Sequence, residues 1–477
     1  MANCTYRIDR FMGIDQSRDE SLVSPSYSPD AMNMDASDGG LCVTKGFSKY
    51  LSAPVPSQDA GAINRICFYK NASGSIPVAI TEKGIYTFNR TNGTWSRLYS
   101  YDSDRVSPCV STLMTRIGMT DTLLIADGMG RVLKFDGSAF SVFGSAGGCS
   151  DIAVSLLAMF RSRLFAAGDA EHPDRLYYSK LPGGERSIED WGPDPDSPSV
   201  EGGHIEIGAA GGDPITALAA MSSQLLIFKK NSVWRLLGDR PGNFTVELIS
   251  RDSSPVFGLA AALYRDVIYY VTKEGLCSFN GVDASPLPDA RMIKGVMAEA
   301  DTSNTRLAVV GDRLYFTVKI GFVTRLIEYD PVMRRYMQYG GFIVRDIVND
   351  DDALILAVSS RYFEKWGVGD DFDGHHITAY WTTPYTDLGD KTLIKTLRSL
   401  YLRGRSYENG RIVITANVGF TEESTSILLP ESVSEVAEVK LKNEGRVFRL
   451  RIANDLGGRF ALTGGMELEM SVRKRSE

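Results

Sequence analysis

The chain has 477 residues, of which 43% are hydrophobic and 23% are charged, and its formal net charge is −7. This length predicts two or three domains, and the composition is that of a globular protein, which excludes long disordered tracts. The negative net charge and the dispersed Lys and Arg residues also exclude a protein that grips nucleic acid over its whole surface.

Residues 1–60 are predicted to form an extended N-terminal arm. Residues 17–38 are rich in Ser, Asp and Pro, which favour turns and extended backbone. The alternative is a disordered leader. We favour an ordered arm because the segment contains apolar anchors that a solvated tail does not need. These anchors are Tyr27, Met32, Met34 and Leu41.

Residues 61–372 repeat one unit, in which a short strand, a turn with Gly and a second strand with an aromatic residue follow one another. The spacing of about 40 to 50 residues matches one four-stranded blade of a WD40-type or kelch-type propeller. Seven copies fit this length, the last of them weak. They begin at Val78, Leu123, Arg163, Leu225, Val267, Arg313 and Ala353.

One copy alone cannot bury its apolar faces, such as Ile80 and Ile85 in the first copy, whereas blades stacked around an axis can. We therefore expect an all-β fold with a β-propeller of six to eight blades, the alternatives being a β-sandwich or a solenoid. The best candidate for a helix is residues 289–299, and it is short.

Residues 373–477 differ from the repeats, because they contain longer runs with alternating apolar positions. This pattern predicts a C-terminal antiparallel β-sandwich or sheet domain beside the propeller. The runs are residues 377–384, 392–404, 410–418, 435–441, 446–454 and 460–473.

The sequence contains no catalytic motif that we can identify, and we expect no enzyme, no cofactor and no metal. There is no G-x-S-x-G, no H-E-x-x-H and no P-loop. The four histidines are interpreted as surface loop residues, and a glycine-rich stretch is interpreted as a flexible loop. The histidines are His172, His204, His375 and His376, and the glycines are Gly202, Gly203, Gly208, Gly211 and Gly212.

A glycoside hydrolase is the sharpest enzymatic alternative. Asn92 to Trp95 (NGTW) resembles half of the aspartate-box turn of sialidase blades, which is a fold element. Two aspartate clusters could supply paired carboxyls, although such runs are usually solvated turns or weak cation sites. The clusters are Asp350, Asp351 and Asp352, and Asp370, Asp371 and Asp373.

The cysteines and the N-terminus indicate a protein that folds in a cytosol. Six cysteines lie at unrelated intervals without a C-x-x-C pair, so we expect free thiols. The start of the chain, MANCTYRIDRF, lacks the pattern of a signal peptide. No apolar run approaches the roughly 18 residues of a membrane span.

The arm resembles the opening of the tail nozzle and packaged-DNA stabilisation proteins of short-tailed bacteriophages. Later segments are similar to the propeller and the terminal sheet domain of that family, namely residues 163–168, 225–238 and 380–402. Lys45 stands where the family usually has Arg. The matching positions of the arm are Gly13, Pro29, Asn33, Met34, Asp35, Gly40, Leu41, Lys45 and Gly46.

The resemblance implies a structural virion protein of a phage tail, made in the cytoplasm of the bacterial host. Members form a homo-oligomeric ring, usually a hexamer, that extends the DNA channel below the portal and adaptor, with tail fibres or a tail spike as further partners. Such a ring retains the packaged genome and lets it exit during infection. A mildly acidic ring suits this role, because many phosphate contacts would slow the passage of double-stranded DNA.

The resemblance also gives the arm a role, because an extended segment gains order by docking on a neighbouring subunit or on the adaptor. The predicted contact residues are Tyr27, Met32, Asn33 and Leu41. Three other functions stay open at this point. They are a tail propeller that binds a host receptor or glycan, the glycoside hydrolase, and a bacterial kelch-like scaffold.

Overall fold

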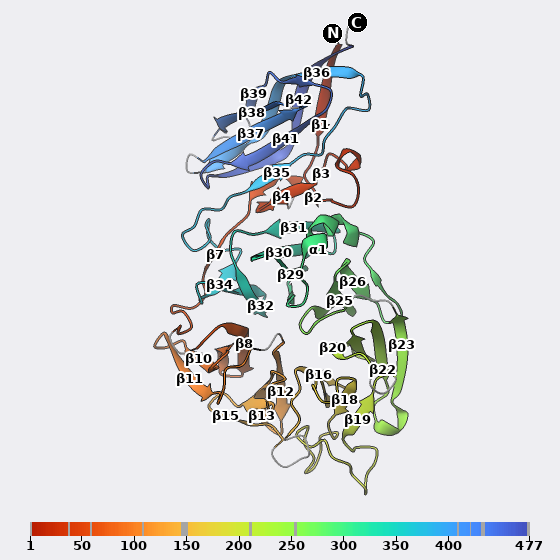
Figure 1. Ribbon diagram of the computed structural model, residues 1–477. Helices are drawn as coiled ribbons and strands as arrows, with labels where there is room; N and C mark the ends of the chain where they lie inside the picture. The colour runs from red at the N-terminus through yellow and green to blue at the C-terminus, as the bar shows by residue number, and fades with distance from the viewer. Residues whose placement is uncertain are drawn as a thin grey trace.

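The computed structural model describes residues 2–36, 39–57, 60–106, 109–144, 151–208, 212–251, 255–407, 410–419, 421–430 and 435–474. Within these ranges the chain is all-β with short helical turns, as predicted. Figure 1 shows a group of small sheets arranged around a centre and, above them, two larger sheets formed mainly by the end of the chain. We call the small sheets the propeller-like body and the larger ones the C-terminal sheets.

The propeller-like body contains seven four-stranded sheets among the described residues, each antiparallel. Six of them are continuous in sequence. The first three are β8 Ile63–Asn71, β9 Gly74–Thr81, β10 Gly84–Asn89 and β11 Thr94–Ser100; β12 Ser111–Ile117, β13 Thr120–Ala126, β14 Leu133–Phe135 and β15 Phe140–Val142; and β16 Leu156–Phe160, β17 Arg163–Ala167, β18 Arg175–Tyr178 and β19 Gly203–Glu206.

The next three sheets follow the same order. They are β20 Ile215–Ala220, β21 Leu225–Lys229, β22 Ser232–Leu237 and β23 Thr245–Arg251; β24 Ala261–Tyr264, β25 Val267–Thr272, β26 Gly275–Phe279 and β27 Ala284–Pro286; and β28 Leu307–Val310, β29 Arg313–Ile320, β30 Val323–Asp330 and β31 Arg335–Tyr339.

The predicted repeats coincide with these sheets. Each copy begins in or next to the second strand of a sheet, where side chains on both faces are buried, as in β17 and β21. A strand that is covered on both faces reads as a continuous apolar run, and the copies were identified by such runs. The fourth strand is more exposed in several sheets, and in β11 no residue is fully buried, whereas all five residues of β31 are buried.

The first strand of each sheet contacts the first strand of the next, from β8 through β28 to β32, and β32 contacts β8. The arrangement therefore closes on itself. Each pair of neighbouring sheets buries apolar residues between them, for example Phe68 of β8 against Phe363 of the last sheet, with ring centroids 6.2 Å apart.

The last sheet of the body is completed by the arm. It consists of β32 Val344–Asp350, β33 Ala353–Val358 and β34 Phe363–Trp366, and its fourth strand is β7 Phe47–Lys49, which pairs antiparallel with β34. The arm was predicted to be extended, so this strand was not predicted. Three residues give no periodicity to recognise, and the partner strand lies about three hundred positions further along the chain.

The two C-terminal sheets share one hydrophobic core. Their strands match five of the predicted runs closely, whereas β38 is a polar strand that the apolar pattern did not predict. The strands are β35 Tyr380–Thr382, β36 Leu393–Tyr407, β37 Arg411–Val418, β38 Thr421–Leu428, β39 Val436–Lys440, β40 Glu444–Gly445, β41 Phe448–Asn454 and β42 Arg459–Lys474.

The arm is ordered where it is described, because its strands pair with both parts of the molecule. One sheet has the order β39-β36-β42-β6-β5 with β1 and β40 alongside, and the other has the order β38-β37-β41-β35-β4. The short strands β2 and β3 pair with each other. The arm strands are β1 Ala2–Ile8, β2 Gly13–Ile14, β3 Tyr27–Ser28, β4 Asp30–Met32, β5 Met34–Asp35 and β6 Leu41–Val43.

The helical elements are short. The predicted helix is confirmed, because residues 289–299 contain η4 Ala290–Ile293 and α1 Lys294–Glu299. The remaining described turns of helix are η1 Glu20–Leu22 and η3 Pro241–Asn243.

Candidate functional site

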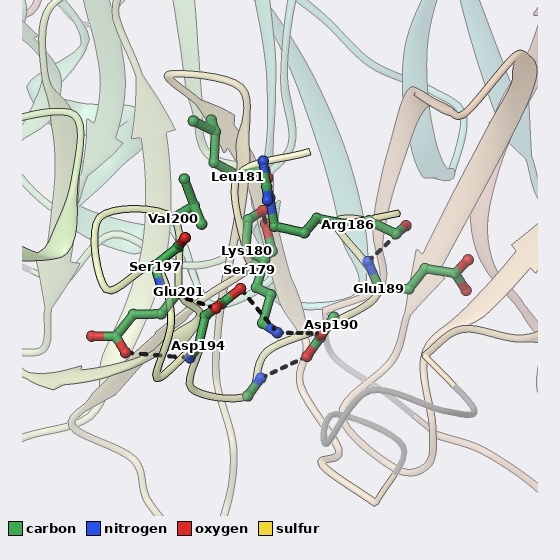
Figure 2. A network of polar contacts seen from close by, with 12 residues as sticks. Ser179, Lys180, Leu181, Arg186, Glu189, Asp190, Asp194, Ser197, Val200 and Glu201 are labelled. Carbon is green, nitrogen blue, oxygen red and sulfur yellow. Dashed lines mark hydrogen bonds and ion pairs between the residues drawn. The ribbon is translucent and has the colours of Figure 1, made fainter. Parts of the chain in front are cut away.

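The best-formed polar site lies on the third sheet of the body, beside the long connection between β18 and β19. This connection, residues 179–202, has almost no regular structure and is folded back on itself (Figure 2). Long irregular connections in compact domains are frequently functional. Two charged side chains hold the connection in place: Lys180, which belongs to the connection itself, and Arg163 of β17.

Lys180, at the start of the connection, holds the segment that contains Asp190 and Asp194. Its Nζ lies 2.8 Å from Asp190 Oδ2 and 3.7 Å from Asp194 Oδ2, between the two carboxylates in Figure 2. The backbone closes around the same point, because Lys180 N–H donates to the Asp190 carbonyl at 2.7 Å. These contacts hold the turn that carries Trp191.

Arg163 holds the two ends of the connection, near Ser179 and Glu201. Its side chain is completely buried at the start of β17, and its guanidinium donates to four carbonyls of the connection. The acceptors are Ser179 O at 2.6 Å, Glu201 O at 2.7 Å, Ser199 O at 2.9 Å and Val200 O at 3.4 Å. Burial lowers the pKa of Arg163 from its ordinary value. The carbonyls accept from its Nη1 and Nη2 groups, whereas the buried Nε has no hydrogen-bond partner among the described residues.

The connection and the sheet together form a cavity of about 500 Å³, which we call the β18 pocket. Its floor is aromatic, because the rings of Tyr177 and Trp191 stack with centroids 5.8 Å apart and planes inclined by 23°. Gly202 makes this packing possible, since a Cβ at that position would lie 2.7 Å from the Trp191 Cα. The polar lining residues include Asp151, Asp169, Glu171, His172, Arg175 and His204.

Hydrogen bonds orient the floor of the pocket. The Tyr177 hydroxyl donates to Asp169 Oδ2 at 2.6 Å, and both side chains are buried. Burial, and next the bond to Asp169, raise the pKa of Tyr177 to about 12, so the phenol stays protonated at neutral pH. The Trp191 indole N–H is already used by the Ile188 carbonyl at 3.0 Å.

The rim of the pocket is polar and partly exposed. Arg175 lies 3.6 Å from Glu206, and His204 lies beside the Tyr177 ring with centroids 6.1 Å apart. Burial, and next the charge of Arg175, lower the pKa of His204, so its imidazole is neutral at neutral pH. The pocket thus offers hydrogen-bond donors and acceptors above an aromatic floor, a combination that suits a polyhydroxylated ligand.

The structure brings together two histidines that the sequence reading treated as separate. His172 and His204 both line the β18 pocket, and His204 pairs with Tyr177 across β18 and β19. Both side chains are exposed, as predicted for all four histidines, but His204 lies in strand β19, so the prediction of a loop position is wrong for it. Pairing between β18 and β19 could not be read from the sequence, because the long connection separates the two strands.

The glycine-rich stretch was only partly a loop. Gly203 begins strand β19, so the prediction of a loop is wrong there, and Gly208 follows the strand with a positive φ of 84°. Gly202 and Gly203 are close to Trp191 and Tyr178, which explains why larger residues would not fit. Gly211 lies outside the described residues.

The predicted partner residues of the arm lie mostly inside this chain. Met32, Asn33 and Leu41 are buried, and Tyr27 is half-buried. Asn33 donates to the carbonyls of Gly340 and Thr378 at 2.9 and 2.8 Å and accepts from Gly340 N–H at 2.9 Å. Contacts within the chain therefore already bury these anchors, and their contact with a partner stays a prediction.

The aspartate clusters are ion-paired. Lys70 lies 2.8 Å from Asp350 and 2.9 Å from Asp351, and Asp370 pairs with Lys45 at 3.0 Å and with Arg459. Asp373 pairs with Lys49 at 3.4 Å. Within the described ranges, no group of three His, Cys, Asp or Glu side chains has the arrangement of a metal site.

No disulfide joins the cysteines that the structure describes, as predicted: Cys4, Cys42, Cys67, Cys109 and Cys277. Cys149 lies outside the described residues. Burial raises the pKa of Cys67 to about 12 and that of Cys277 to about 11, which makes both unreactive. No helix in the described part of the chain is long and apolar enough to cross a membrane.

Comparisons with known proteins identify no family. No protein-family model matches the sequence, and no curated protein matches it. The extracellular domain of the putative one component system BT4673 from B. thetaiotaomicron is similar in structure, with a TM-score of 0.45 and 14% identity over 76% of this chain and 44% of that chain. A second structure of that domain, described as part of a putative hybrid two component system, gives a TM-score of 0.41 and 13% identity over 77% of this chain and 44% of that one.

A chain of the Mitotic Checkpoint Complex gives a TM-score of 0.36 and 13% identity over 67% of this chain and 99% of that chain. This chain therefore spans less than half of the length of the sensor domains that it matches.

Proposed function

We propose that this protein is a structural subunit of a bacteriophage tail, in which copies form a subunit ring that extends the DNA channel, retains the packaged genome and releases it on infection. We also propose that it is not an enzyme. The resemblance of the arm to tail nozzle proteins suggests this function. The structural observation that supports it best is an open edge of the C-terminal sheets.

This open edge is formed by β38 and β39. Each of them is the edge strand at one end of its sheet. At the other end, the edge strands β4 and β5 both contact β31 of the propeller-like body. Leu428 at the end of β38 and Val436 at the start of β39 are about half exposed. No other strand in the described part of the chain pairs with this edge, and a strand edge flanked by apolar side chains is suited to pairing with another copy of the chain.

The finer architecture belongs to the same proposal. We propose a propeller of seven blades in residues 61–372, closed by β7 of the arm, and a β-sandwich in residues 373–477. The contact between β32 and β8 and the core shared by the C-terminal sheets support this division. The arm, residues 1–60, joins the two parts.

The test is the oligomeric state of the purified chain, alone and mixed with a portal and adaptor complex, by mass photometry and negative-stain microscopy. We expect a closed ring that docks coaxially on the adaptor. Replacing Leu428 and Val436 by Lys should reduce ring formation, whereas Leu456→Lys, at an exposed position in the turn between β41 and β42, should not. A chain that stays monomeric under all these conditions would contradict the proposal.

The β18 pocket favours a second function, the binding of a host glycan. Its aromatic floor, neutral imidazole, carboxylates and guanidinium can bind sugar hydroxyls. Glycan-array binding that is lost in Arg175→Ala and His204→Ala, and kept in His376→Ala outside the pocket, would support this function. Cleavage of a fluorogenic sialoside would instead favour the glycoside hydrolase.

A further inference from the structure

A second cavity lies where the inner strands of three sheets begin, and nothing in the proposed functions uses it. It has a volume of about 530 Å³ and is lined by residues next to the starts of β8, β28 and β32 together with the β29–β30 hairpin. Because the first strands of the sheets surround the centre of the body, this cavity opens at one end of that centre. We call it the axial cavity.

The axial cavity has exposed apolar side chains on its rim. Phe322 is 96% exposed, Val106 is 70% exposed, and Ile343 is also exposed. Phe322 occupies the two-residue turn that joins Ile320 to Val323, where Gly321 supplies the positive φ of 59°. Neither the turn nor the core requires an aromatic residue at this position. A polar residue there would support folding equally well.

The lining of the axial cavity is basic. Arg306, Lys319 and Arg345 face one carboxylate, that of Glu82, which already accepts from the backbone N–H of Ala62 at 2.9 Å. Lys319 and Arg345 are exposed, and no described carboxylate lies within ion-pair distance of either. After the hydrogen bonds from Ser303, however, the charge of Lys319 contributes to a lowered pKa of Asp301. The cavity therefore carries more positive than negative charge.

Arg306 is held in place at the base of the cavity. Its Nε lies 3.3 Å from Asp346 Oδ1, and Arg65 Nη1 donates to the same oxygen at 2.7 Å. Asp346 is fully buried, and its second oxygen accepts from Ile66 N–H at 2.7 Å. Two guanidiniums thus lie beside one carboxylate, and this buried contact fixes the position of Arg306 in the lining.

We propose that the axial cavity binds an extended acidic peptide segment of a partner protein, with an apolar side chain of the peptide packed against Phe322, Val106 and Ile343. The basic lining complements carboxylates, and the apolar rim complements an aromatic or aliphatic side chain. A nucleic-acid backbone would satisfy the charge but would leave the rim uncovered. The peptide is therefore the occupant that uses both features.

The test uses a short fluorescein-labelled peptide that alternates Glu with Leu and Phe, measured by fluorescence anisotropy at low salt. We expect binding that weakens with added salt and that falls at least about fivefold in Phe322→Ser and in the double variant Lys319→Glu and Arg345→Glu. The same peptide with Lys in place of Glu should not bind.

Met119→Ser is the matched control. Met119 is 85% exposed in the turn between β12 and β13, which joins Ile117 to Thr120 and also uses a glycine of positive φ, Gly118. This variant removes an equally exposed apolar side chain from the same kind of turn outside the axial cavity. We expect it to leave peptide binding unchanged.

Three results would overturn the proposal: no binding of the acidic peptide, equal loss in the Met119 control, or preferential binding of a short DNA duplex through Lys319 and Arg345. Self-association that depends on Phe322 in sedimentation experiments would assign the cavity to a second copy instead. The proposal does not depend on the subunit ring, because a monomeric chain can still bind the peptide.

Discussion

Single buried polar residues in this chain have effects that extend beyond their own strands. Glu364 in β34 is fully buried beside Leu356 of the neighbouring strand, and neither of its carboxylate oxygens has a hydrogen-bond partner among the described residues. Burial, and next the charge of Asp373, raise the pKa of Glu364 to about 7. The nearby Lys49 opposes this shift.

We predict that Glu364 destabilises the protein increasingly as the pH rises. Below the ordinary pKa of about 4.5 the side chain is neutral in both the folded and the unfolded state, and it costs nothing extra. Between that pH and about 7 the unfolded state loses the proton first, so the free energy of unfolding falls by about 3 kcal/mol and then stays constant.

Glu364→Gln should therefore be about as stable as the parent chain at pH 4 and more stable at pH 8, by about 3 kcal/mol. Urea unfolding at both pH values measures this difference. Glu422→Gln, on the exposed strand β38, is the control and should show no such pH dependence. An equal effect of Glu364→Gln at the two pH values would contradict the prediction.

Asn33 joins the arm to both parts of the molecule at one point. It has a positive φ of 54°, its backbone N–H donates to Gln338 O at 3.0 Å, and its amide bridges Gly340 and Thr378. Asparagine is one of the few residues with a side chain that adopts this backbone conformation readily.

We predict that Asn33→Ala lowers the free energy of unfolding by about 2 to 4 kcal/mol, because it loses the three amide hydrogen bonds and strains the backbone. Asn33→Gly should be less harmful by about 1 kcal/mol, since glycine tolerates the positive φ. Urea denaturation of both variants separates the two contributions. Equal losses in Ala and Gly would show that the backbone conformation contributes nothing.

At the scale of elements, the short strand β7 connects the beginning of the chain to the last sheet of the body. Phe47 is buried among aromatic rings there, with its centroid 5.1 Å from Phe372, 5.2 Å from Phe342 and 6.4 Å from Trp366. The backbone of Phe47 pairs with Trp366 of β34. One side chain thus supports both the strand pairing and the packing of the last sheet.

We predict that Phe47→Ala lowers the free energy of unfolding by about 3 to 5 kcal/mol, because it leaves a cavity in this aromatic cluster. Phe322→Ala, at an almost fully exposed position, should change the stability by no more than about 0.5 kcal/mol. Thermal and urea unfolding of the two variants provide the comparison. A loss below about 1 kcal/mol for Phe47→Ala would mean that β7 contributes little to the last sheet.

At the scale of the whole molecule, one hydrophobic core extends from the last two sheets of the body through the arm to the C-terminal sheets. It includes Leu326 and Leu356 of the body, Met34 and Leu41 of the arm, and Leu450 of the C-terminal sheets. Figure 1 shows the arm strands β2, β3 and β4 between the two parts. The arm is therefore an internal connection between them.

We predict that the two parts unfold together in the full chain. Hydrogen exchange in increasing urea should show the same free energy of opening for β42 as for β33, because both depend on the shared core. In a variant that lacks residues 1–45, the two parts should open separately. Separate opening in the full chain would contradict this prediction.

The sequence by itself determined the repeating part of this protein and much of its end. Continuous apolar runs located the second strands of the seven sheets, and alternating patterns located β36, β37 and β42, because burial of a strand on two faces or on one leaves a local pattern. The proposed role in a phage tail also comes from the sequence, through the resemblance of the arm.

The tertiary structure alone decided where the arm lies and which residues form the sites. The pairing of β7 with β34, the hydrogen bonds of Asn33, the β18 pocket and the axial cavity each join residues that are far apart in the chain. The polar strand β38 was missed for the same reason, since it is defined by its pairing with β37. Such contacts leave no local periodicity, so they become visible only when the sheets are assembled.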